Sequence, residues 1–424
     1  MLISSRLLKL CFLFLGVFLI AASPVHSDPV LDGLIDEALK NSPEIKASAA
    51  RIEAASLRIP QAGSLPDPML MAGYQNEGFN RYTYGEMQGS QWMFSATQQF
   101  LFPGKQKLKE EMTERDAESL EAMHELLKLK TVARVKELYF DLFLAYKNID
   151  LLKDKRELLA RIESLTITRY AAGKAMQQDV IMAQTEKYML LEKEEMAGQK
   201  VQSLEAMLSA AIGRYKGSAL PRPSEPVYQP FSLDMNEAIY LAMRYSPELK
   251  SRNKMIEAAN TILAMAQKEY YPDFALGGSY FNRARDFPDM WAATVTINIP
   301  VYFQSKQKPA VMEAKANINQ AGQELEATRL MIEAALRDNY SMLRSSEKLM
   351  DIYQKGLLPK TRQDIEQALS GYSTGSGEAV SIISRLKTLL DYESLYWGQL
   401  VEREKAIARL QAITTGLKDG GETR

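Results

Sequence analysis

The phrase "SPEIK" (Ser42–Lys46) returns later in the chain as "SPELK" (Ser246–Lys250). In both copies serine stands where a helix cap is expected, proline takes the first helical position, and glutamate falls in the first turn. This order is typical of a helix start. We therefore predict helices over residues 42–64 and 246–270, each capped by its serine side chain and followed by a Pro-Asp break.

The residues after both copies also correspond, which indicates a duplicated chain. The matching pairs are "PDPMLMAGY" (66–74) with "PDFALGGSY" (272–280), "WMFSAT" (92–97) with "WAATVT" (291–296), "KQK" (105–107) with "KQK" (306–308), and "YAAG" (170–173) with "YSTG" (372–375). We predict a first repeat over 28–213, a linker over 214–236, a second repeat over 237–416 and a tail over 417–424. Closely spaced prolines mark the linker, namely Pro221, Pro223, Pro226 and Pro230.

Each repeat is predicted to contain two β-strands after its Pro-Asp break. Apolar and polar residues alternate in "WMFSAT" and "WAATVT", which gives each strand one apolar and one polar face. Such strands suit a membrane barrel and also a soluble sandwich. The candidate aromatic residues of a barrel surface are Trp92, Phe102, Trp291 and Tyr302. Because about eight strands are the practical minimum for a closed barrel, four strands would have to be shared between chains. A trimer would supply twelve strands and a dimer eight.

The segments after the strands show helical spacing of apolar residues over 105–168 and 306–370. At 1.5 Å per residue the first would be about 96 Å long. Pro359 predicts a kink near the end of the second. Helices over 176–212 and 378–415 would return along them beyond the "YAAG" and "YSTG" turns. We expect each repeat to be an antiparallel helical hairpin with a β-hairpin at its far end.

Residues 1–27 are predicted to be a secretory signal peptide. An arginine and a lysine precede an apolar run over 10–22, and small residues at 20–22 and 25–27 offer cleavage sites. The run is short for an uncleaved anchor helix, which is the alternative. Cys11 is not preceded by the small residues of a lipoprotein signal, so we expect no lipidation.

Composition excludes several function classes. The 52 lysines and arginines almost balance the 53 aspartates and glutamates, so no basic surplus favours a nucleic-acid partner. Once the signal is removed, no cysteine would remain and His124 would be the only histidine. That excludes disulfides, thiolate metal sites and histidine-based triads. We therefore predict no enzyme, no metal site and no cofactor.

An export signal, two-faced strands and very long helices together describe a channel-tunnel. The mature chain resembles the TolC family of outer-membrane efflux channels over essentially its whole length. Within that family, "AGSLPDPMLMAGYQ" (62–75) and "QQFLFPGKQKLK" (98–109) resemble the branch serving heavy-metal efflux pumps of the CzcC and CusC kind. The resemblance implies a mainly α fold with membrane β: duplicated long helical hairpins plus four β-strands per chain, forming a trimeric α/β-barrel channel-tunnel.

The resemblance also implies location and partners. A homotrimer would sit in outer-membrane lipid with its tunnel in the periplasm, and would dock through a periplasmic adaptor (membrane fusion) protein to an inner-membrane RND-type pump. Conduction of heavy-metal cations would be passive, with a gate at the periplasmic tip that opens when helical hairpins swing outward. Drugs or type I secreted proteins are alternative cargoes. A periplasmic coiled-coil adaptor or scaffold is the alternative from another class of protein.

In the family the tip is held shut by an aspartate after the first-half turn, a tyrosine before the second-half glycine and an arginine just after it. Asp179 matches the aspartate and Tyr372 the tyrosine, so the resemblance implies a gating role for both. Gly377 stands at the arginine position, so that ion pair is absent. The alternative is that Asp179 and Tyr372 are ordinary turn residues.

Further along the second-half turn, acidic positions of some family members hold Ser381 and Ser384 here. Glu378 is the nearby carboxylate that would line the entrance instead. The turn glycines Gly173 and Gly375 complete the candidate tip residues.

Three methionines recur every seven residues in the helix expected over 176–212, namely Met182, Met189 and Met196. Heptad spacing is typical of a packed helix seam. Thioethers also bind soft ions such as Cu⁺, so a ladder of ion sites is the alternative to packing.

Overall fold

The computed structural model describes residues 28–215, 220–284, 286–374 and 377–414. The predicted signal peptide, the predicted tail and Gly375 lie outside these residues. One order of elements occurs twice along the chain. It comprises α1 (Pro29–Asn41), α2 (Pro43–Ala62), β1 (Met69–Gln75), β2 (Gln91–Phe100), α3 (Lys105–Ala171) and α4 (Gln177–Ala211), and then α5 (Met235–Tyr245), α6 (Pro247–Lys268), β3 (Asp273–Asn282), β4 (Met290–Asn298), α7 (Gln307–Ile352), η1 (Tyr353–Leu357), α8 (Leu358–Thr374) and α9 (Ala379–Thr414). The predicted duplication of helical hairpins and strands is confirmed.

The two "SPE" phrases lie at bends between helices, not at the first helix of each repeat. The amide N–H of Ser42 donates to the carbonyl oxygen of Ala38 in α1 (3.0 Å), while its own carbonyl accepts from Lys46 in α2 (3.1 Å). Ser246 joins α5 to α6 in the same way. Neither serine side chain makes the predicted capping hydrogen bond, so that prediction was wrong. Both serines are buried and serve two helices through their backbone.

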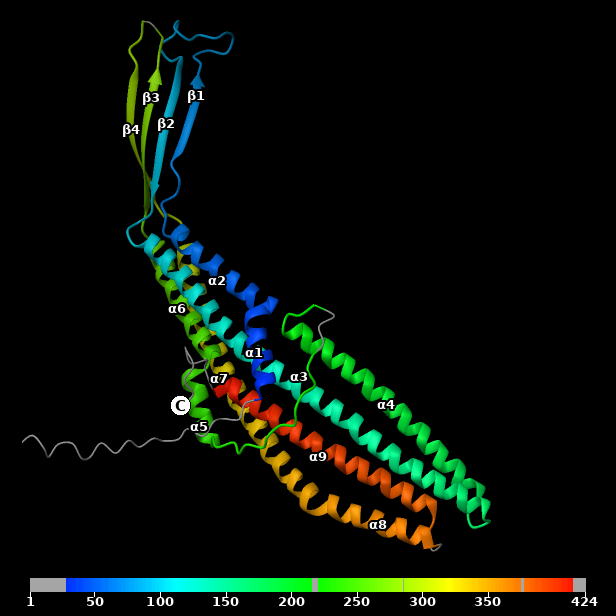
Figure 1. The fold of residues 1–424 in the computed structure, drawn as a ribbon. Coiled ribbons are helices and arrows are strands. Elements are labelled where there is room, and N and C mark those ends of the chain that lie inside the picture. The colour runs from blue at the N-terminus through cyan, green and yellow to red at the C-terminus, as the bar shows by residue number, and fades with distance from the viewer. Residues whose placement is uncertain (1–27, 216–219, 285, 375–376, 415–424) are drawn as a thin grey trace, which may run out of the picture.

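The four strands form one antiparallel sheet in the order β1-β2-β3-β4, which extends from one end of the helices (Figure 1). Ala72 lies opposite Phe94 in the first hairpin, and Gly278 lies opposite Ala293 in the second. Between the repeats, Ala96 of β2 pairs with Gly278 of β3. β1 and β4 are therefore the two edge strands of the described sheet.

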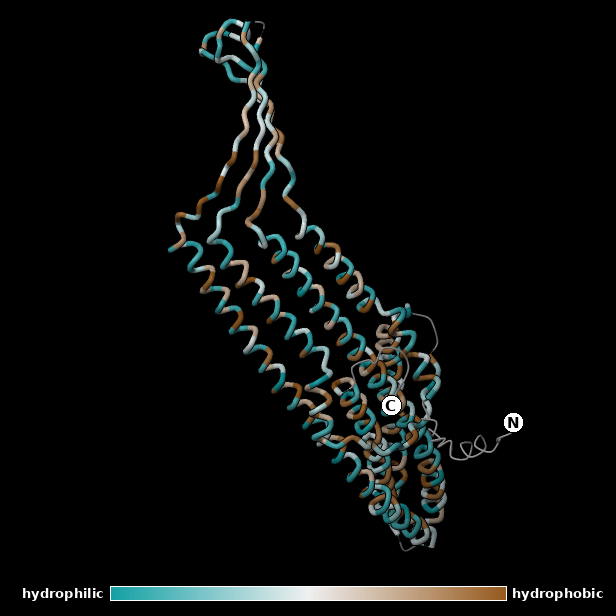
Figure 2. Tube along the Cα trace, turned by 90° about the vertical axis from the view of Figure 1, so that its left-hand side faces the viewer, coloured by the Kyte–Doolittle hydropathy of each residue, from teal (hydrophilic) through white to brown (hydrophobic). Residues whose placement is uncertain are grey.

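The predicted alternation of the strands is present and makes one face mostly apolar, whereas the opposite face carries hydroxyl residues together with Met71, Met93 and Phe281. The apolar face carries Leu70, Ala72, Trp92, Phe94, Phe274, Leu276, Tyr280, Trp291, Val295 and Ile297, and the opposite face carries Ser95, Thr97, Ser279, Thr294 and Thr296. Figure 2 shows hydrophobic stretches along the strands and mostly hydrophilic loops at their far end. Many of the large apolar side chains remain exposed in the single chain.

The helices next to the sheet continue its order. α3 contacts α2 on one side and α6 on the other, and α6 also contacts α7, so the layer runs α2-α3-α6-α7 beneath β1-β2-β3-β4 (Figure 2). α4 returns along α3, and α9 lies against both α3 and α7. No helix in the described ranges has an apolar stretch long enough to cross a membrane.

The long helix of the second repeat bends where η1 widens its turn (Figure 1). We predicted a kink near Pro359, and the π-helical turn ends at Leu357, two residues before that proline. A wider turn relieves the clash between the proline ring and the preceding carbonyls. α3, which contains no proline, runs without interruption over 67 residues.

The segment between the repeats crosses the middle of the helical body and is fastened by polar contacts. The Ser224 hydroxyl donates to Asp28 (2.6 Å), which also accepts from the buried Tyr139 hydroxyl. Burial and the Asp28 hydrogen bond raise the pKa of Tyr139 to about 12. Further along, the guanidinium of Arg403 in α9 donates to the carbonyl oxygen of Gln229 and lies over the Tyr228 ring, 4.1 Å from its centroid.

Candidate functional site at the helical tip

The two helical hairpins meet at the end of the molecule farthest from the sheet (Figure 1). A cluster of buried apolar side chains joins α3, α4, α8 and α9 there, and its members include Leu159, Ile162, Ala183, Leu190, Tyr372, Ile382 and Leu386. The Y-x-x-G turns predicted where each hairpin reverses, and the family resemblance implied that the two hairpins share a tip. Within the tip, polar side chains then decide how firmly α8 is held to α3.

The first-half turn ends α3 with a glycine in the left-handed conformation. Gly173 has φ +68°, its N–H donates to the Tyr170 carbonyl (2.9 Å), and the Lys174 N–H donates to the Arg169 carbonyl (2.8 Å). These two hydrogen bonds form a Schellman motif, which favours glycine at this position. Gly173 therefore serves to end the helix. Its predicted counterpart Gly375 lies outside the described residues.

Tyr372 is buried between α8 and α3. Its side chain is 2% exposed, and its hydroxyl donates to the Thr166 Oγ1 (2.9 Å). The Thr166 hydroxyl in turn donates to the Ile162 carbonyl in its own helix (2.8 Å). The predicted tip tyrosine thus fastens the end of α8 to the last turns of α3 within one chain.

Arg169 is a tip residue that the sequence analysis missed. Its guanidinium lies 4.4 Å from the centroid of the Tyr372 ring and donates to the Tyr372 carbonyl oxygen. A second N–H donates to the Lys174 carbonyl (3.2 Å), so Arg169 links both turns. A cation over an aromatic ring is favourable, more so away from water. The one sequence signal was a basic residue in the last turn of a helix, where it suits the helix dipole. That signal does not identify a partner in α8.

The backbone around Gly377 explains why no arginine stands there. A Cβ at Gly377 would lie 3.0 Å from the backbone nitrogen and 3.2 Å from the Cα of Tyr372. Both atoms belong to the backbone and cannot turn aside, so any side chain at this position would be crowded. The positive charge of the tip comes instead from Arg169 in the first repeat.

The other predicted tip residues are not brought onto Tyr372. The Asp179 carboxylate accepts the N–H of Met176 (3.2 Å) and so closes the first turn of α4. Glu378 is exposed. Ser381 accepts from the Arg385 guanidinium through its hydroxyl, and the Ser384 carbonyl accepts from Thr388 (3.1 Å).

Ion pairs fasten α8 and α9 above the tip. The largely buried Glu393 carboxylate of α9 lies 2.8 Å from the Lys155 ammonium of α3 and 2.9 Å from the Arg362 guanidinium of α8. Nearer the tip, Arg385 of α9 pairs with Asp364 of α8 (2.7 Å). Because the Glu393 group is shielded from water, removing one partner would leave a costly buried charge.

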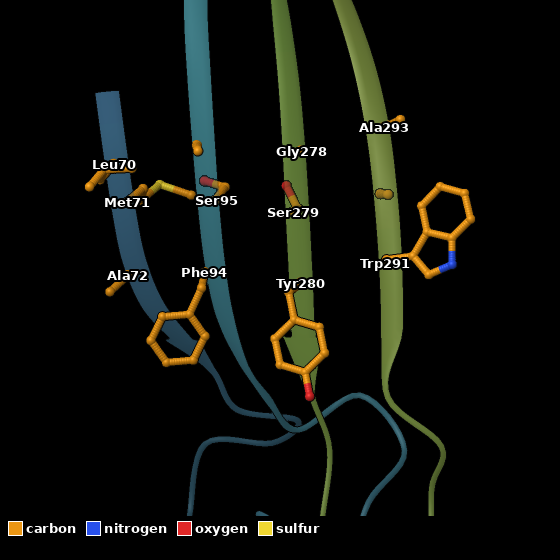
Figure 3. A pocket seen from close by; sticks show the side chains of 12 residues that line it. Leu70, Met71, Ala72, Phe94, Ser95, Gly278, Ser279, Tyr280, Trp291 and Ala293 are labelled. Atoms are coloured by element: carbon orange, nitrogen blue, oxygen red, sulfur yellow. The ribbon is translucent and has the colours of Figure 1, made fainter. Parts of the chain in front are cut away.

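The predicted aromatic residues of the sheet lie at its two ends. Trp92 and Trp291 are near the hairpin loops, and Phe94 and Tyr280 project side by side from one face while Trp291 points away from the edge strand (Figure 3). Phe102 and Tyr302 lie beyond the strands, in the turns that lead into α3 and α7, so their predicted place at strand ends was slightly wrong. The extended backbone stops there because each turn must redirect the chain into a helix.

The methionine series of α4 is only partly packed within the chain. Met182 contacts the apolar tip cluster, whereas Met189 and Met196 are 41% and 64% exposed. Among the described residues, no three histidine, cysteine, aspartate or glutamate side chains converge on a common point.

The fold is shared with solved channel structures at low sequence identity. A membrane protein from Pseudomonas aeruginosa matches with a TM-score of 0.82 at 16% identity, covering 93% of this chain and 92% of that one. CusC, which forms a transmembrane channel, matches with a TM-score of 0.79 at 15% identity and 92% coverage of both chains. The outer membrane protein VceC from Vibrio cholerae matches with a TM-score of 0.77 at 17% identity, covering 92% of this chain and 97% of that one.

No curated protein matches the chain significantly by sequence. A family model described as outer membrane efflux protein matches residues 34–214 and 238–394, which fall in the two repeats and leave out most of the segment between them. The match spans well over half of the chain and agrees with the fold, with its doubled hairpins and four strands. The chain belongs to the outer membrane efflux protein family.

Proposed function

We propose that the protein is the outer-membrane channel of a tripartite efflux system, and that three copies form one tunnel. The observation that carries this is the sheet: four strands with an apolar and a polar face, open at both edges, continue directly into very long helices. Four strands cannot close a ring, and three copies would supply twelve. Two copies would supply eight, which leaves an interior filled mostly by side chains.

In this assembly the apolar sheet face meets lipid and the polar face lines the lumen. The eight residue steps from Trp92 to Phe100 span about 26 Å, close to the apolar band of a membrane barrel. Trp92 and Trp291 would form the outer aromatic girdle, and Phe102 and Tyr302 the inner one. Serine and threonine hydroxyls, such as those of Ser95, Thr294 and Thr296, would then face passing solutes without strong binding.

The helical tip is the proposed gate. Tyr372 and Arg169 hold α8 to α3 in the closed state, and Asp179, Glu378 and the turn residues Gly173 and Gly375 surround the entrance. An adaptor and an RND-type pump of the inner membrane would shift the tip to an open state by binding that state more tightly. Conduction itself needs no catalytic group. An adaptor or scaffold would instead have one helical hairpin inserted into β-rich domains, unlike the two hairpins seen here.

The assembly is tested on the full chain extracted from outer membranes with detergent. We expect a trimer that migrates differently on a gel before and after heating, because closed membrane barrels resist unfolding by detergent. A soluble periplasmic monomer would rule out the channel.

We further propose heavy-metal cations as the cargo, on the strength of the "AGSLPDPMLMAGYQ" and "QQFLFPGKQKLK" segments. The tunnel is not selective in this scheme, since the pump chooses the solute. A deletion strain should become sensitive to metals such as copper, zinc or cadmium and regain resistance with the wild-type gene. Sensitivity confined to drugs would assign drugs as the cargo instead. Loss of a secreted protein would assign that protein as the cargo.

A further inference from the structure

A buried ion pair fastens the two repeats to each other where the sheet meets the helices. Lys105, the first residue of α3, is 1% exposed, and its ammonium lies 3.0 Å from the Asp273 carboxylate. It also donates to the Tyr271 carbonyl oxygen (3.1 Å). The Asp273 carboxylate accepts the backbone N–H of Phe102 (2.7 Å), and the Phe102 ring stacks on Tyr271 with centroids 4.5 Å apart. With a second, longer ion pair from Lys105 to Glu269 at the end of α6 (3.4 Å), two charge pairs and one apolar contact thus join the β2–α3 corner to the second repeat.

The duplicated sequence contains a counterpart for four of these residues, but at the outer edges of the molecule. The two "KQK" segments match Lys105 with Lys306 and Phe102 with Phe303, and the two Pro-Asp breaks match Asp273 with Asp67 and Tyr271 with Leu65. Lys306 and Phe303 lie between β4 and α7, at one end of the layer. Asp67 and Leu65 lie between α2 and β1, at the other end.

These four counterparts are all exposed in the single chain. Phe303 is 44% and Leu65 48% exposed, although both are large and apolar. Within the described residues, the Lys306 and Asp67 side chains make no hydrogen bond or ion pair, in contrast to the buried Lys105 and Asp273. A cation and an apolar side chain are therefore exposed at one edge, and an anion and an apolar side chain are exposed at the other.

We propose that Lys306 and Phe303 of one copy bind Asp67 and Leu65 of the neighbouring copy, so that the contact between subunits repeats the contact between the two halves of each subunit. The partner is a second copy of this chain, because opposite charges and matched apolar residues stand on its two edges. The inference deepens the proposed function and rests on it, since the copies must meet edge to edge.

The correspondence between the two repeats also predicts the register between the edge strands of neighbouring copies. Ala72 corresponds to Gly278 and Phe94 to Ala293, and the two hairpin registers agree with both matches. The observed pairing of Ala96 with Gly278 then places Val295 of β4 opposite Ala72 of the neighbouring β1. Both residues belong to the apolar face, so that face continues unbroken from copy to copy. A one-residue slip would put apolar side chains on the polar face.

Charge reversal tests the ion pair in the full-length protein purified from outer membranes. We expect Asp67→Lys and Lys306→Asp each to lower the temperature at which the trimer dissociates, because each places like charges together. The double variant should recover most of the loss. Lys308→Asp is the matched control, since this neighbouring lysine is also exposed but has no counterpart role in the interface. If the dissociation temperature of the double variant is no higher than the sum of the two single losses predicts, the proposed pair is overturned.

Disulfide trapping tests the register. The only native cysteine is Cys11, in the predicted signal peptide. Oxidation of Ala72→Cys/Val295→Cys should give covalent dimers and trimers, because directly opposed residues meet the distance that a disulfide needs. Ala72→Cys/Ala293→Cys is the control, shifted by two residues on the same face. Equal or greater linkage in the control would overturn the register. If the protein is a trimer but shows neither charge rescue nor the predicted disulfide, this inference alone is wrong. If the protein is a monomer, the proposed channel is wrong as well.

Discussion

At the residue scale, the tip uses the expected tyrosine with an unexpected cation. The resemblance predicted an arginine just after the second-half glycine, and the sequence has Gly377 there. The structure shows why that position is crowded and supplies Arg169 from the other repeat. Tyr372 was predictable from its motif. Its partners Thr166 and Arg169 were not, because contacts across more than two hundred residues leave no mark on the local pattern.

Replacing Tyr372 by phenylalanine removes one buried hydrogen bond while keeping the ring under Arg169. We expect the free energy of unfolding to fall by about 1 kcal/mol, because the Thr166 hydroxyl keeps its bond to Ile162. If the tip is the gate, the variant should also let a large antibiotic enter cells more readily. Tyr170→Phe is the matched control, since this tyrosine is the motif counterpart and is 46% exposed. Equal effects of the two substitutions would remove Tyr372 from the closed-state contacts.

The pair of Glu37 and Arg214 predicts a pH dependence. Two N–H groups of Arg214 donate to the two carboxylate oxygens of Glu37 (2.6 and 2.7 Å). The hydrogen bonds from Arg214 lower the pKa of Glu37 in the folded state. Because the folded pKa is the lower one, the stabilisation is present above the unfolded pKa of about 4.3 and is lost as the pH falls below it.

For a partly exposed pair we expect this stabilisation to be about 1 kcal/mol at neutral pH. Glu37→Gln should lower the melting temperature near pH 7 and leave it almost unchanged near pH 3. Thermal unfolding followed by circular dichroism across this range measures the difference. A wild-type advantage that persists at pH 3 would contradict the assignment.

At the scale of elements, the sequence predicted the long helices and the strands within a few residues. The periods of apolar residues were sufficient for this, because each element buries one face. The "SPE" phrases were correctly predicted as helix starts, but the side-chain caps of their serines were wrong, since local preference does not show that another helix ends directly before each serine. The π-helical turn was also missed. Besides Pro359, its trace in the sequence is that the spacing from Lys306 to Tyr372 is one residue longer than the matching spacing from Lys105 to Tyr170.

A π turn spans i to i+5 where an α turn spans i to i+4, so η1 can hold the extra residue of the second repeat. Deleting Gly356, which lies within η1, and replacing Pro359 by alanine, which removes the ring that the wide turn accommodates, should therefore leave an uninterrupted α-helix whose two ends keep their original orientation. We expect this deletion variant to assemble and to keep Tyr372 buried. Acrylamide-resistant tyrosine fluorescence and the yield of the trimer measure this.

The matched control deletes Asp154, an exposed residue in the uninterrupted helix α3. With no wide turn to close, the rest of α3 must rotate by about 100° around its axis. We expect that variant to lose assembly. Failure of both variants, or survival of both, would show that η1 does not absorb the extra residue.

At the scale of the whole molecule, the segment between the repeats ties the two halves together at their middle. Arg403 is fully buried and lies 3.3 Å from Glu347 of α7, besides its bonds to Glu404 and to the linker carbonyl of Gln229. Burial raises the pKa of Glu404, which Arg403 partly offsets. Neither contact was predictable, because the linker was recognised only by its prolines.

Arg403→Met should destabilise the protein strongly, because it leaves the Glu404 carboxylate buried without its cation. We expect a loss of about 3 kcal/mol or more in the free energy of unfolding. Arg344→Met is the control, since Arg344 pairs with the same Glu347 (3.0 Å) but is largely exposed, and its loss should cost at most about 1 kcal/mol. Denaturant unfolding of both variants gives the comparison, and similar losses would contradict a special role for burial.

If the tip is the gate, η1 is the natural pivot for its movement. α8 has 17 residues, so the arm from the wide turn to the end of the helix is about 26 Å long. A pivot of about 15° at η1 would carry the end of α8 sideways by about 7 Å, while the sheet and the upper helices stay in place. In the proposed gate, the movement would then be confined to α8, which is short, while the sheet and the upper helices keep their arrangement.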